Sequence, residues 1–407
     1  MKRLFSKKFF LVLGWVSLLG VIFFGILRAY TKEGHDFSVF YEAWRLVLAG
    51  RGTEIYRVSP DRFLYSPSFA WLLSPMAFLP KNTALGFWCA LKVAVLGFMI
   101  HRLSGTSDRK KLFLSWGVSV WGVVLIARPV LIDFEYGQVN LFIVAACLWG
   151  LTGHFEKTNS AFWEILRWGI LTFVAVVKLF PLPLLIVPWV VTEGIDPKKL
   201  KLERQATFLG LAVALFLPLL SLGLEPTGKL FLDWREALLA RGLPMESHNQ
   251  SFTALLYHYL SGRPTSVLSE GSHPLVFGQA WLSEFQIVLL SLFWTITLMG
   301  LILAWVILGS RRRYKVWIAV LIALLIVPSH LIWKPYFVMS LPLAVLLVRQ
   351  HVDHPRWVSL GILISIFFGI NLTGFDFVGH HWAAHLEAAS LLLMIHLAMI
   401  LFGIFCF

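Results

Sequence analysis

The apolar positions of the sequence gather in long uninterrupted runs, and short polar segments separate one run from the next. A run of about 20 apolar residues is long enough to cross the hydrocarbon core of a membrane as a helix. The runs predict about twelve transmembrane helices, at residues 9–29, 82–103, 112–129, 137–153, 162–177, 179–192, 206–223, 285–309, 316–331, 335–349, 357–373 and 385–405. We therefore expect an all-α integral membrane protein whose single multi-span domain covers residues 1–407.

The first apolar run follows a basic start, MKRLFSKK, as the apolar part of a signal peptide does. It is too long for a signal peptide and no small-residue cleavage site follows it, so we interpret it as a retained first helix. Near Lys178, Pro181 and Pro183 predict a break, which leaves either one kinked helix or two short ones. An even number of spans places both termini in the cytoplasm, and the loops on that side then carry the whole net charge of +13.

The composition agrees with this interpretation. Hydrophobic residues make up 58% of the chain and charged residues 14%, whereas a soluble protein needs about a quarter of its residues charged to cover its surface. A soluble enzyme, a secreted disulfide scaffold and a disordered chain are therefore excluded. The basic residues lie in short clusters between apolar runs, which is the pattern of the positive-inside rule, so we expect the lipid bilayer and no nucleic acid as a partner.

Two long segments, residues 30–81 and 224–284, face the outside in this arrangement, and long loops in a compact membrane protein are usually functional. In the first segment an apolar stripe at helical spacing predicts an amphipathic helix that lies along the membrane surface. Its members are Phe37, Phe40, Tyr41, Trp44 and Leu48, and Gly50 would end the helix. We expect the chemistry of the protein at its outer face.

Asp36 stands at the first position of this helix. As an N-cap, its carboxylate would accept backbone N–H bonds. As a general base at the mouth of the helix bundle, it would accept a proton from a reacting hydroxyl. The two interpretations compete, because N–H bonds to a carboxylate lower its pKa and weaken it as a base.

A series of short motifs follows in a fixed order along most of the chain. Its six members are Asp36 with Tyr41, Gly50 and Tyr56; Tyr65 with Pro67; Gly137 with Gln138 and Asn140; Lys178 with Pro181; Asn249 to Ser251; and Trp333 with Tyr336. Each motif alone is common, but the six in this order resemble glycosyltransferase family 87. That family contains membrane-embedded mannosyltransferases and arabinofuranosyltransferases that use polyprenyl-phosphate sugars.

The resemblance implies the architecture of C-type, lipid-phosphate-dependent glycosyltransferases, with long outward-facing loops. It implies transfer of a sugar, most often mannose in this family, from a polyprenyl-phosphate donor by a single inverting displacement. A glycolipid, a polysaccharide or a protein would all fit as the extracytoplasmic acceptor. The family is mostly bacterial, so we expect the inner membrane, with the active site facing the periplasm or the cell exterior, and no cofactor.

The resemblance makes Asp36 the catalytic base and suggests four residues for the donor phosphate. Lys178 is the first, because a lysine between two apolar half-spans needs a partner or a function, although it could also snorkel to the interface. Arg128 is the second, with an interfacial anchor as the alternative. In the late loop, Pro335 stands where many family members have a histidine, which leaves Lys334 and His330 as the remaining candidates.

The same resemblance implies substrate binding by a set of polar side chains: Tyr41, Tyr65, Gln138, Asn140, Asn249 and Gln250. For the residues of Gly137–Asn140 and Asn249–Ser251 the alternative is structural, since such side chains also satisfy the backbone groups at a helix start. No metal site is expected, because His380, His381 and His385 have no carboxylate partner or HExxH spacing.

Two other classes of function stay open at this point. A transporter or lipid flippase would suit twelve spans and the lysines Lys92 and Lys178 inside them. Against it stand the long outer segments and the lack of a visible internal repeat. A structural membrane scaffold would tolerate the loss of Asp36.

Overall fold

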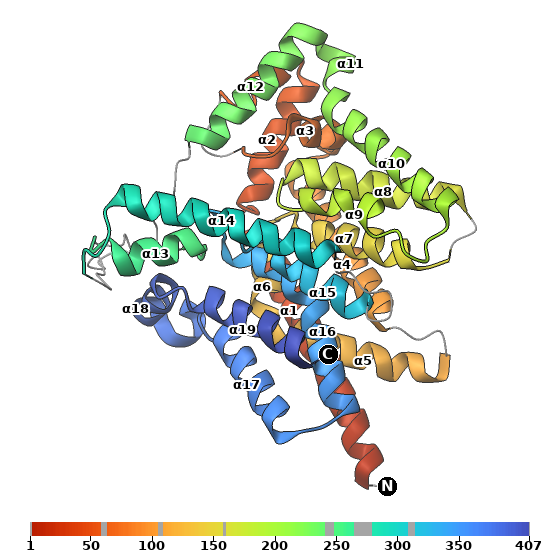
Figure 1. Cartoon of the computed structure of the whole chain (residues 1–407), viewed down its shortest axis with the longest axis vertical. Helices are drawn as coiled ribbons and strands as arrows, with labels where there is room; N and C mark the ends of the chain where they lie inside the picture. The colour runs from red at the N-terminus through yellow and green to blue at the C-terminus, as the bar shows by residue number, and fades with distance from the viewer. Residues whose placement is uncertain are drawn as a thin grey trace.

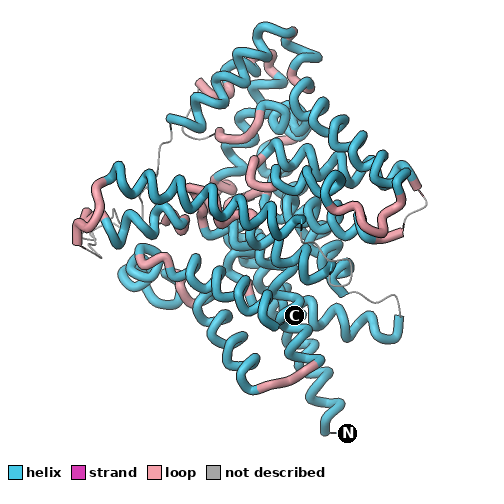
Figure 2. The backbone as a smooth tube through the Cα atoms, in the orientation of Figure 1, coloured by secondary structure: helices cyan, strands magenta, loops and turns pink. Residues whose placement is uncertain are grey.

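The computed structural model describes residues 2–57, 63–104, 109–157, 160–240, 248–263, 279–307 and 314–406, and for residues 2–8, 109–114, 375, 380, 381, 384 and 406 it describes the backbone alone. Throughout these ranges the elements are helices, and the β contact recorded there is one isolated bridge between Ser261 and Ala280 (Figure 2). The all-helical fold that the apolar runs predict is therefore confirmed for the described part of the chain.

The longest helices have the length and composition of membrane spans. Among the described residues five stretches qualify: Phe9–Thr31 in α1 (Lys2–Thr31), α4 (Lys81–Ser104), Pro197–Leu222 in α10 (Pro197–Phe216) and α11 (Leu219–Leu222), α14 (Glu284–Ile307), and Lys334–Asp353 in η5 (Lys334–Ser340) and α16 (Leu341–Asp353). A sixth candidate is the pair α5 (Arg109–Leu125) and α6 (Ala127–Glu135), whose two helices meet at 74°. The chain is thus a membrane protein by its helices, while the count of twelve spans and the topology built on it stay predictions.

Shorter apolar helices fill most of the remaining predicted spans. They are α7 (Asn140–Phe155), α8 (Ala161–Val177), α15 (Tyr314–Leu324), α17 (Trp357–Asn371) and α19 (Leu391–Cys406). The expected break near Lys178 is confirmed, because α8 ends at Val177 and Leu179 takes a positive φ of 35°. The predicted span at 179–192 is not one helix. It consists of the short 3-10 helix η3 (Leu182–Ile186) and α9 (Val187–Val190), since prolines interrupt the hydrogen-bond ladder.

The core lies around α7, which is buried on nearly all sides and packs against α4, α8, α15 and η5. Helices α1, α10 and α14 lie at the periphery and expose large apolar side chains, among them Phe9, Phe208 and Phe293 (Figure 1). A soluble protein rarely exposes apolar surface on this scale. These three helices therefore have the surface expected of lipid-facing elements.

The predicted amphipathic helix of the 30–81 segment is α2 (Asp36–Leu48). Its apolar stripe faces the bundle, because Phe37, Phe40 and Trp44 are fully buried against the side chains of Phe69 and Trp88. The 3-10 turn η1 (Gly52–Glu54) follows α2, and further along are α3 (Pro67–Leu73) and η2 (Ser74–Phe78), two short elements beside α2.

The 224–284 segment contains α12 (Leu224–Ala240) and α13 (Phe252–Leu260). Helix α12 lies at the same end of the molecule as α2 and α3 (Figure 1). Two contacts join α12 to the chain between α2 and α3. Trp234 Nε1 donates to Leu64 O at 3.0 Å, and Arg57 pairs with Asp233 at 3.7 Å. The two long segments predicted to face the same side of the membrane therefore contact each other. The last helix before α19 is α18 (Phe375–Ala388), in which Gly379 has non-helical dihedral angles.

Candidate active site

Asp36 is the first helical residue of α2, and the N-cap position belongs to His35, whose φ is 30°. The backbone N–H of Phe37 donates to Gly34 O at 2.6 Å and to Tyr136 O at 3.2 Å, which ties the start of α2 to the end of α6. The half-buried Asp36 carboxylate accepts a hydrogen bond from Gln138 Nε2. The competing interpretation of Asp36 as the N-cap residue is therefore wrong.

Gln138 owes its position to a tight turn at the end of α6. The N–H of Gln138 donates to Asp133 O at 3.0 Å and the N–H of Gly137 donates to Phe134 O at 3.0 Å, as in a helix end closed by a left-handed residue. Gly137 has a φ of 63°, and a Cβ there would lie 2.5 Å from Phe37 Cβ. Only glycine fits this position, and the turn delivers Gln138 to Asp36.

Lys178 lies at the break after α8, and its ammonium reaches the other side of the same glutamine. Its Nζ donates to Asn140 Oδ1 at 2.8 Å and to Gln138 Oε1 at 3.2 Å. The phenol of Tyr65 accepts from Nζ at 3.4 Å and donates to Gln138 Oε1 at 3.0 Å. Gln138 thus joins a carboxylate on its amide nitrogen to an ammonium group on its amide oxygen.

Tyr65 is held in this network by Tyr56, whose hydroxyl donates to Tyr65 O at 2.5 Å. Burial, together with the charge of Asp233, raises the pKa of Tyr56 well above its ordinary value, so the phenol stays protonated and can donate. Ser66 and Pro67 then start α3 immediately after Tyr65. Tyr56 and Tyr65 belong to successive motifs of the sequence, and the side chain of Tyr56 therefore holds the backbone of Tyr65.

A late-loop residue, Tyr336 of η5, completes the surroundings of Lys178. Its ring centroid lies 4.0 Å from Lys178 Nζ, and the ring of Tyr65 lies 5.4 Å away. An ammonium group over an aromatic face is stabilised by the ring quadrupole. The site therefore draws on five distant stretches of sequence: the start of α2, the residues just before α3, the turn from α6 to α7, the break after α8, and η5.

Behind this network lies a fully buried ion pair. Lys92 Nζ of α4 is 2.6 Å from Asp133 Oδ1 of α6, and neither side chain is exposed. Lys92 also donates to the carbonyl oxygen of Asp133. Among the described residues, the Asp133 carboxylate oxygens and Asn140 Nδ2 are buried atoms without a hydrogen-bond partner.

Three of the other predicted substrate-binding residues make hydrogen bonds to backbone groups away from Asp36 and Lys178. Tyr41 donates to Leu79 O at 2.7 Å. Asn249 bonds the backbone of His330 and Ile332, and Gln250 donates to Glu387 O at 2.6 Å. Each of these bonds tightens the protein scaffold, which favours the structural alternative for these residues.

The other predicted phosphate-binding cations lie in a second cluster, which we name the α6–α18 charged cluster: Arg28, Lys32, Arg128, Glu135, Lys334, Asp376 and Glu387. Lys334 pairs with Glu387, and Arg128 Nη1 lies 3.8 Å from Asp376 Oδ2. His330 is bonded to Thr253 Oγ1 at 3.0 Å. Of the four candidates for the donor phosphate, Lys178 is therefore the one that the structure brings to Asp36.

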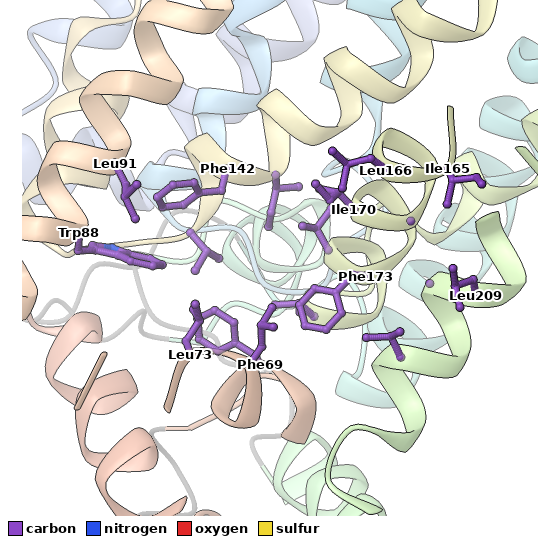
Figure 3. Close-up of a pocket in the computed structure, with 18 residues that line it drawn as sticks. Phe69, Leu73, Trp88, Leu91, Phe142, Ile165, Leu166, Ile170, Phe173 and Leu209 are labelled. Atoms are coloured by element: carbon purple, nitrogen blue, oxygen red, sulfur yellow. The ribbon is translucent and has the colours of Figure 1, made fainter. Parts of the chain in front are cut away.

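An apolar pocket of about 480 Å³ adjoins the site (Figure 3). Side chains of α3, α4, α7, α8 and α10 line it, including Phe69, Trp88, Phe142 and Phe173. Its wall contains Val139 and Val177, the chain neighbours of Gln138 and Lys178. On its rim Leu72, Leu209 and Val213 are exposed, so the pocket opens toward the outside of the bundle.

The described residues contain no group of three or more His, Cys, Asp or Glu side chains that could hold a metal ion. The side chains of His380 and His381 lie outside those described.

Several residues with contacts in these clusters were not among the predicted site residues, including Lys92, Asp133, Tyr336 and Glu387. The sequence carried a signal for the two acids, because a carboxylate in a largely apolar stretch needs a cationic partner. Tyr336 was matched to a motif, but nothing in the sequence indicated that its ring lies over Lys178.

One of three comparisons with known proteins gave a match. The model of glycosyltransferase family 87 matches residues 63–333, about two-thirds of the chain, a range that contains Tyr65, Gln138 and Lys178 but neither Asp36 nor Tyr336. Neither a search of curated proteins nor a search of solved structures gave a match. The resemblance seen in the sequence motifs is confirmed, and the chain belongs to glycosyltransferase family 87.

Proposed function

We propose that this membrane glycosyltransferase moves a sugar, which we take to be mannose, from a polyprenyl-phosphate donor to an acceptor hydroxyl outside the cytoplasm. The observation that carries the proposal is the convergence of the Asp36 carboxylate and the Lys178 ammonium on the two ends of Gln138, at the edge of an apolar pocket. A carboxylate and a cation held side by side match the two charges that such a transfer creates. The apolar pocket matches a lipid-linked donor.

In the proposed step Asp36 takes the proton of the acceptor hydroxyl, and the oxygen attacks the anomeric carbon of the sugar. The bond from that carbon to the phosphate oxygen breaks, and polyprenyl phosphate leaves with the electron pair. One displacement inverts the anomeric configuration and needs no second, nucleophilic carboxylate. Lys178 stabilises the charge that grows on the departing phosphate, where a cation is most effective in a water-poor site.

The pocket supports a lipid donor because its lining is apolar and its rim is exposed on the side of α8 and α10. A polyprenyl chain that lies between these helices would bring its phosphate to the end of the pocket marked by Val177 and Lys178. The cations Arg128 and Lys334 of the α6–α18 charged cluster, and His330, remain further candidates for phosphate contacts. Their acidic or hydroxyl partners would have to release them first.

The transporter alternative has less support. Lys92, one of the two lysines that suggested it, is fully buried in its pair with Asp133. A lysine that carries a substrate or ion across a membrane needs access to water on each side in turn. The other lysine, Lys178, belongs to the site that contains Asp36.

The test is transfer of radiolabelled mannose from polyprenyl-phosphate mannose by the full chain in membranes, for the wild type, Asp36→Asn and Glu42→Gln. Glu42 is a matched control, because it is a carboxylate on the same helix that is exposed and pairs only with Arg45 among the recorded ion pairs. Loss of the base should slow transfer by about 10²–10⁴-fold, and the control should retain the wild-type rate. Equal rates for the three proteins would remove Asp36 from the mechanism, and no transfer from any lipid-linked sugar by the wild type would refute the donor class.

A further inference from the structure

Two side chains of α4 donate to the turn that carries Gln138, and we name them the α4 clamp: Trp88 and Lys92. Trp88 Nε1 donates to Gly137 O at 2.8 Å. Lys92 Nζ donates to Asp133 O, the same oxygen that accepts from the N–H of Gln138 at 3.0 Å. The two donors are four residues apart, so they lie on one face of α4. The clamp therefore holds the turn at its first carbonyl and at the carbonyl just before Gln138.

The ring of Trp88 also contacts the helix that carries Asp36. Its centroid lies 6.0 Å from that of Trp44 and 6.2 Å from that of Phe37, both on the buried stripe of α2. Gln138 Nε2 in turn donates to the Asp36 carboxylate. Trp88 thus contacts both elements that this hydrogen bond joins, the start of α2 and the turn from α6 to α7. A change at Trp88 would move the amide relative to the carboxylate.

The carbonyl groups of the turn need these donors because they are buried. Gly137 and Asp133 are both buried residues. A buried carbonyl that loses its donor costs free energy, and the chain around it shifts toward other partners. Phenylalanine in place of Trp88 would keep an aromatic ring against α2 and the apolar pocket, which Trp88 lines (Figure 3). It would remove only the N–H that Gly137 O accepts.

We propose that the α4 clamp positions Gln138 and thereby sets the geometry between the Asp36 base and the Lys178 ammonium. Neither residue of the clamp touches the reacting atoms in the proposed step. The proposal rests on the proposed function and extends it to residues that act through Gln138. Its signature is slower transfer from bound donor, because the apolar pocket and the bond from Lys178 to Asn140 at 2.8 Å stay in place.

The main variant is Trp88→Phe in the full chain, with kcat, donor KM and the thermal unfolding midpoint measured with labelled polyprenyl-phosphate mannose. A single change of Lys92 is not suitable, because it would leave the Asp133 charge unpaired in the core. The second variant is therefore Lys92→Met with Asp133→Leu, which removes the other donor of the clamp and is neutral.

Trp317→Phe is the matched control for the loss of a buried indole N–H. Trp317 is buried, and its Nε1 donates to Trp305 O at 2.6 Å. Its ring packs on Phe155, the last residue of α7, whereas Asn140 is the first. The 15 residues between these two ends span about 22 Å at 1.5 Å per residue, so the control lies far from the site.

A double-mutant cycle tests whether Trp88 acts through Gln138. Trp88→Phe is made again in a Gln138→Ala background, and single-turnover rates are measured with the enzyme in excess of the labelled donor. A residue that only positions Gln138 has nothing left to position in that background. A residue with a merely structural role would lower the rate by the same factor in both backgrounds.

We expect kcat to fall about tenfold in Trp88→Phe and in the Lys92–Asp133 double variant, with the donor KM within about threefold, since misplaced groups slow the reaction. Trp317→Phe should keep the wild-type kcat, and Trp88→Phe should cost less than about twofold in the Gln138→Ala background.

Three results would overturn the positioning role and leave the proposed function intact: a wild-type kcat in Trp88→Phe, an equal loss in Trp317→Phe, or the full tenfold loss in the Gln138→Ala background. A wild type that transfers no lipid-linked sugar would instead refute the proposed function, and the positioning role with it.

Discussion

Replacement of Lys178 by methionine should separate catalysis from folding. The ammonium group makes hydrogen bonds to Asn140 and Gln138 at 2.8 and 3.2 Å and lies 4.0 Å from the ring of Tyr336. Methionine has a similar length and no charge, so it removes the cation from the site but keeps most of the packing. Two effects on the unfolding midpoint then oppose each other: loss of a half-buried charge raises it, and loss of the donor to the buried Asn140 Oδ1 lowers it.

The expected size of the effect follows from the role of the ammonium group. One cation that bonds the departing phosphate contributes about 3 kcal/mol through charge-assisted hydrogen bonds. A loss of about 3 kcal/mol lowers kcat/KM roughly 150-fold, since each 1.4 kcal/mol is about a factor of ten. Lys178→Arg keeps the charge, but its planar guanidinium replaces a compact ammonium group that three oxygens surround. This variant should therefore recover only part of the rate.

The assay is the initial rate of mannose transfer by purified protein at several donor concentrations, with the unfolding midpoint measured on the same samples. A Lys178→Met protein whose kcat/KM stays within about threefold of the wild type would show that the lysine only bridges the scaffold.

Three further changes test the surroundings of the site. Tyr336→Leu should raise the donor KM about tenfold in the same assay through loss of the cation–π contact, and an unchanged KM would exclude that contact. Gly169→Phe should partly fill the apolar pocket, since nothing lies within 4 Å of a Cβ at Gly169. It should raise KM about tenfold for a long polyprenyl donor and leave a short-chain donor unaffected, and equal effects on both donors would exclude the pocket as the site of the lipid chain. Gly122→Ala should lower stability by about 1–3 kcal/mol in a thermal unfolding assay, because the new Cβ would lie 2.5 Å from Val345 Cα. Gly97→Ala should leave the stability unchanged, because a Cβ there would meet open space. A Gly122→Ala protein that unfolds at the same midpoint as Gly97→Ala would show that α5 and α16 can move apart.

The sequence was informative wherever a polar group stood in apolar surroundings. Lys178 was predicted as a site residue on that ground and by its motif, and Asp36 and Gln138 were predicted by their motifs. The structure brings the three together. The helix 36–48 and the break after Val177 were also predictable, because an apolar stripe and two prolines specify local structure.

What the sequence could not specify was the partner of each polar group. Lys334 and Lys178 look alike as isolated lysines, yet one pairs with Glu387 and the other joins Asp36 through Gln138. The partner of each lysine depends on which helices pack together, and the local sequence does not determine that packing. Leu48 belongs to the predicted apolar stripe, yet at the last residue of α2 it is 39% exposed, whereas Phe37, Phe40 and Trp44 are buried.

The spread of the site along the chain has a consequence for how the protein is made. Lys92 and Asp133 are 41 residues apart, so at about 5–20 residues per second the ribosome supplies the partner of this intramembrane charge within roughly 2–8 seconds. Tyr336 follows Asp36 by about 300 residues, which takes roughly 15–60 seconds. During synthesis the inner ion pair can therefore close while the site is still open, and an unfinished chain in the membrane would carry its buried charges already matched but no complete constellation for sugar transfer.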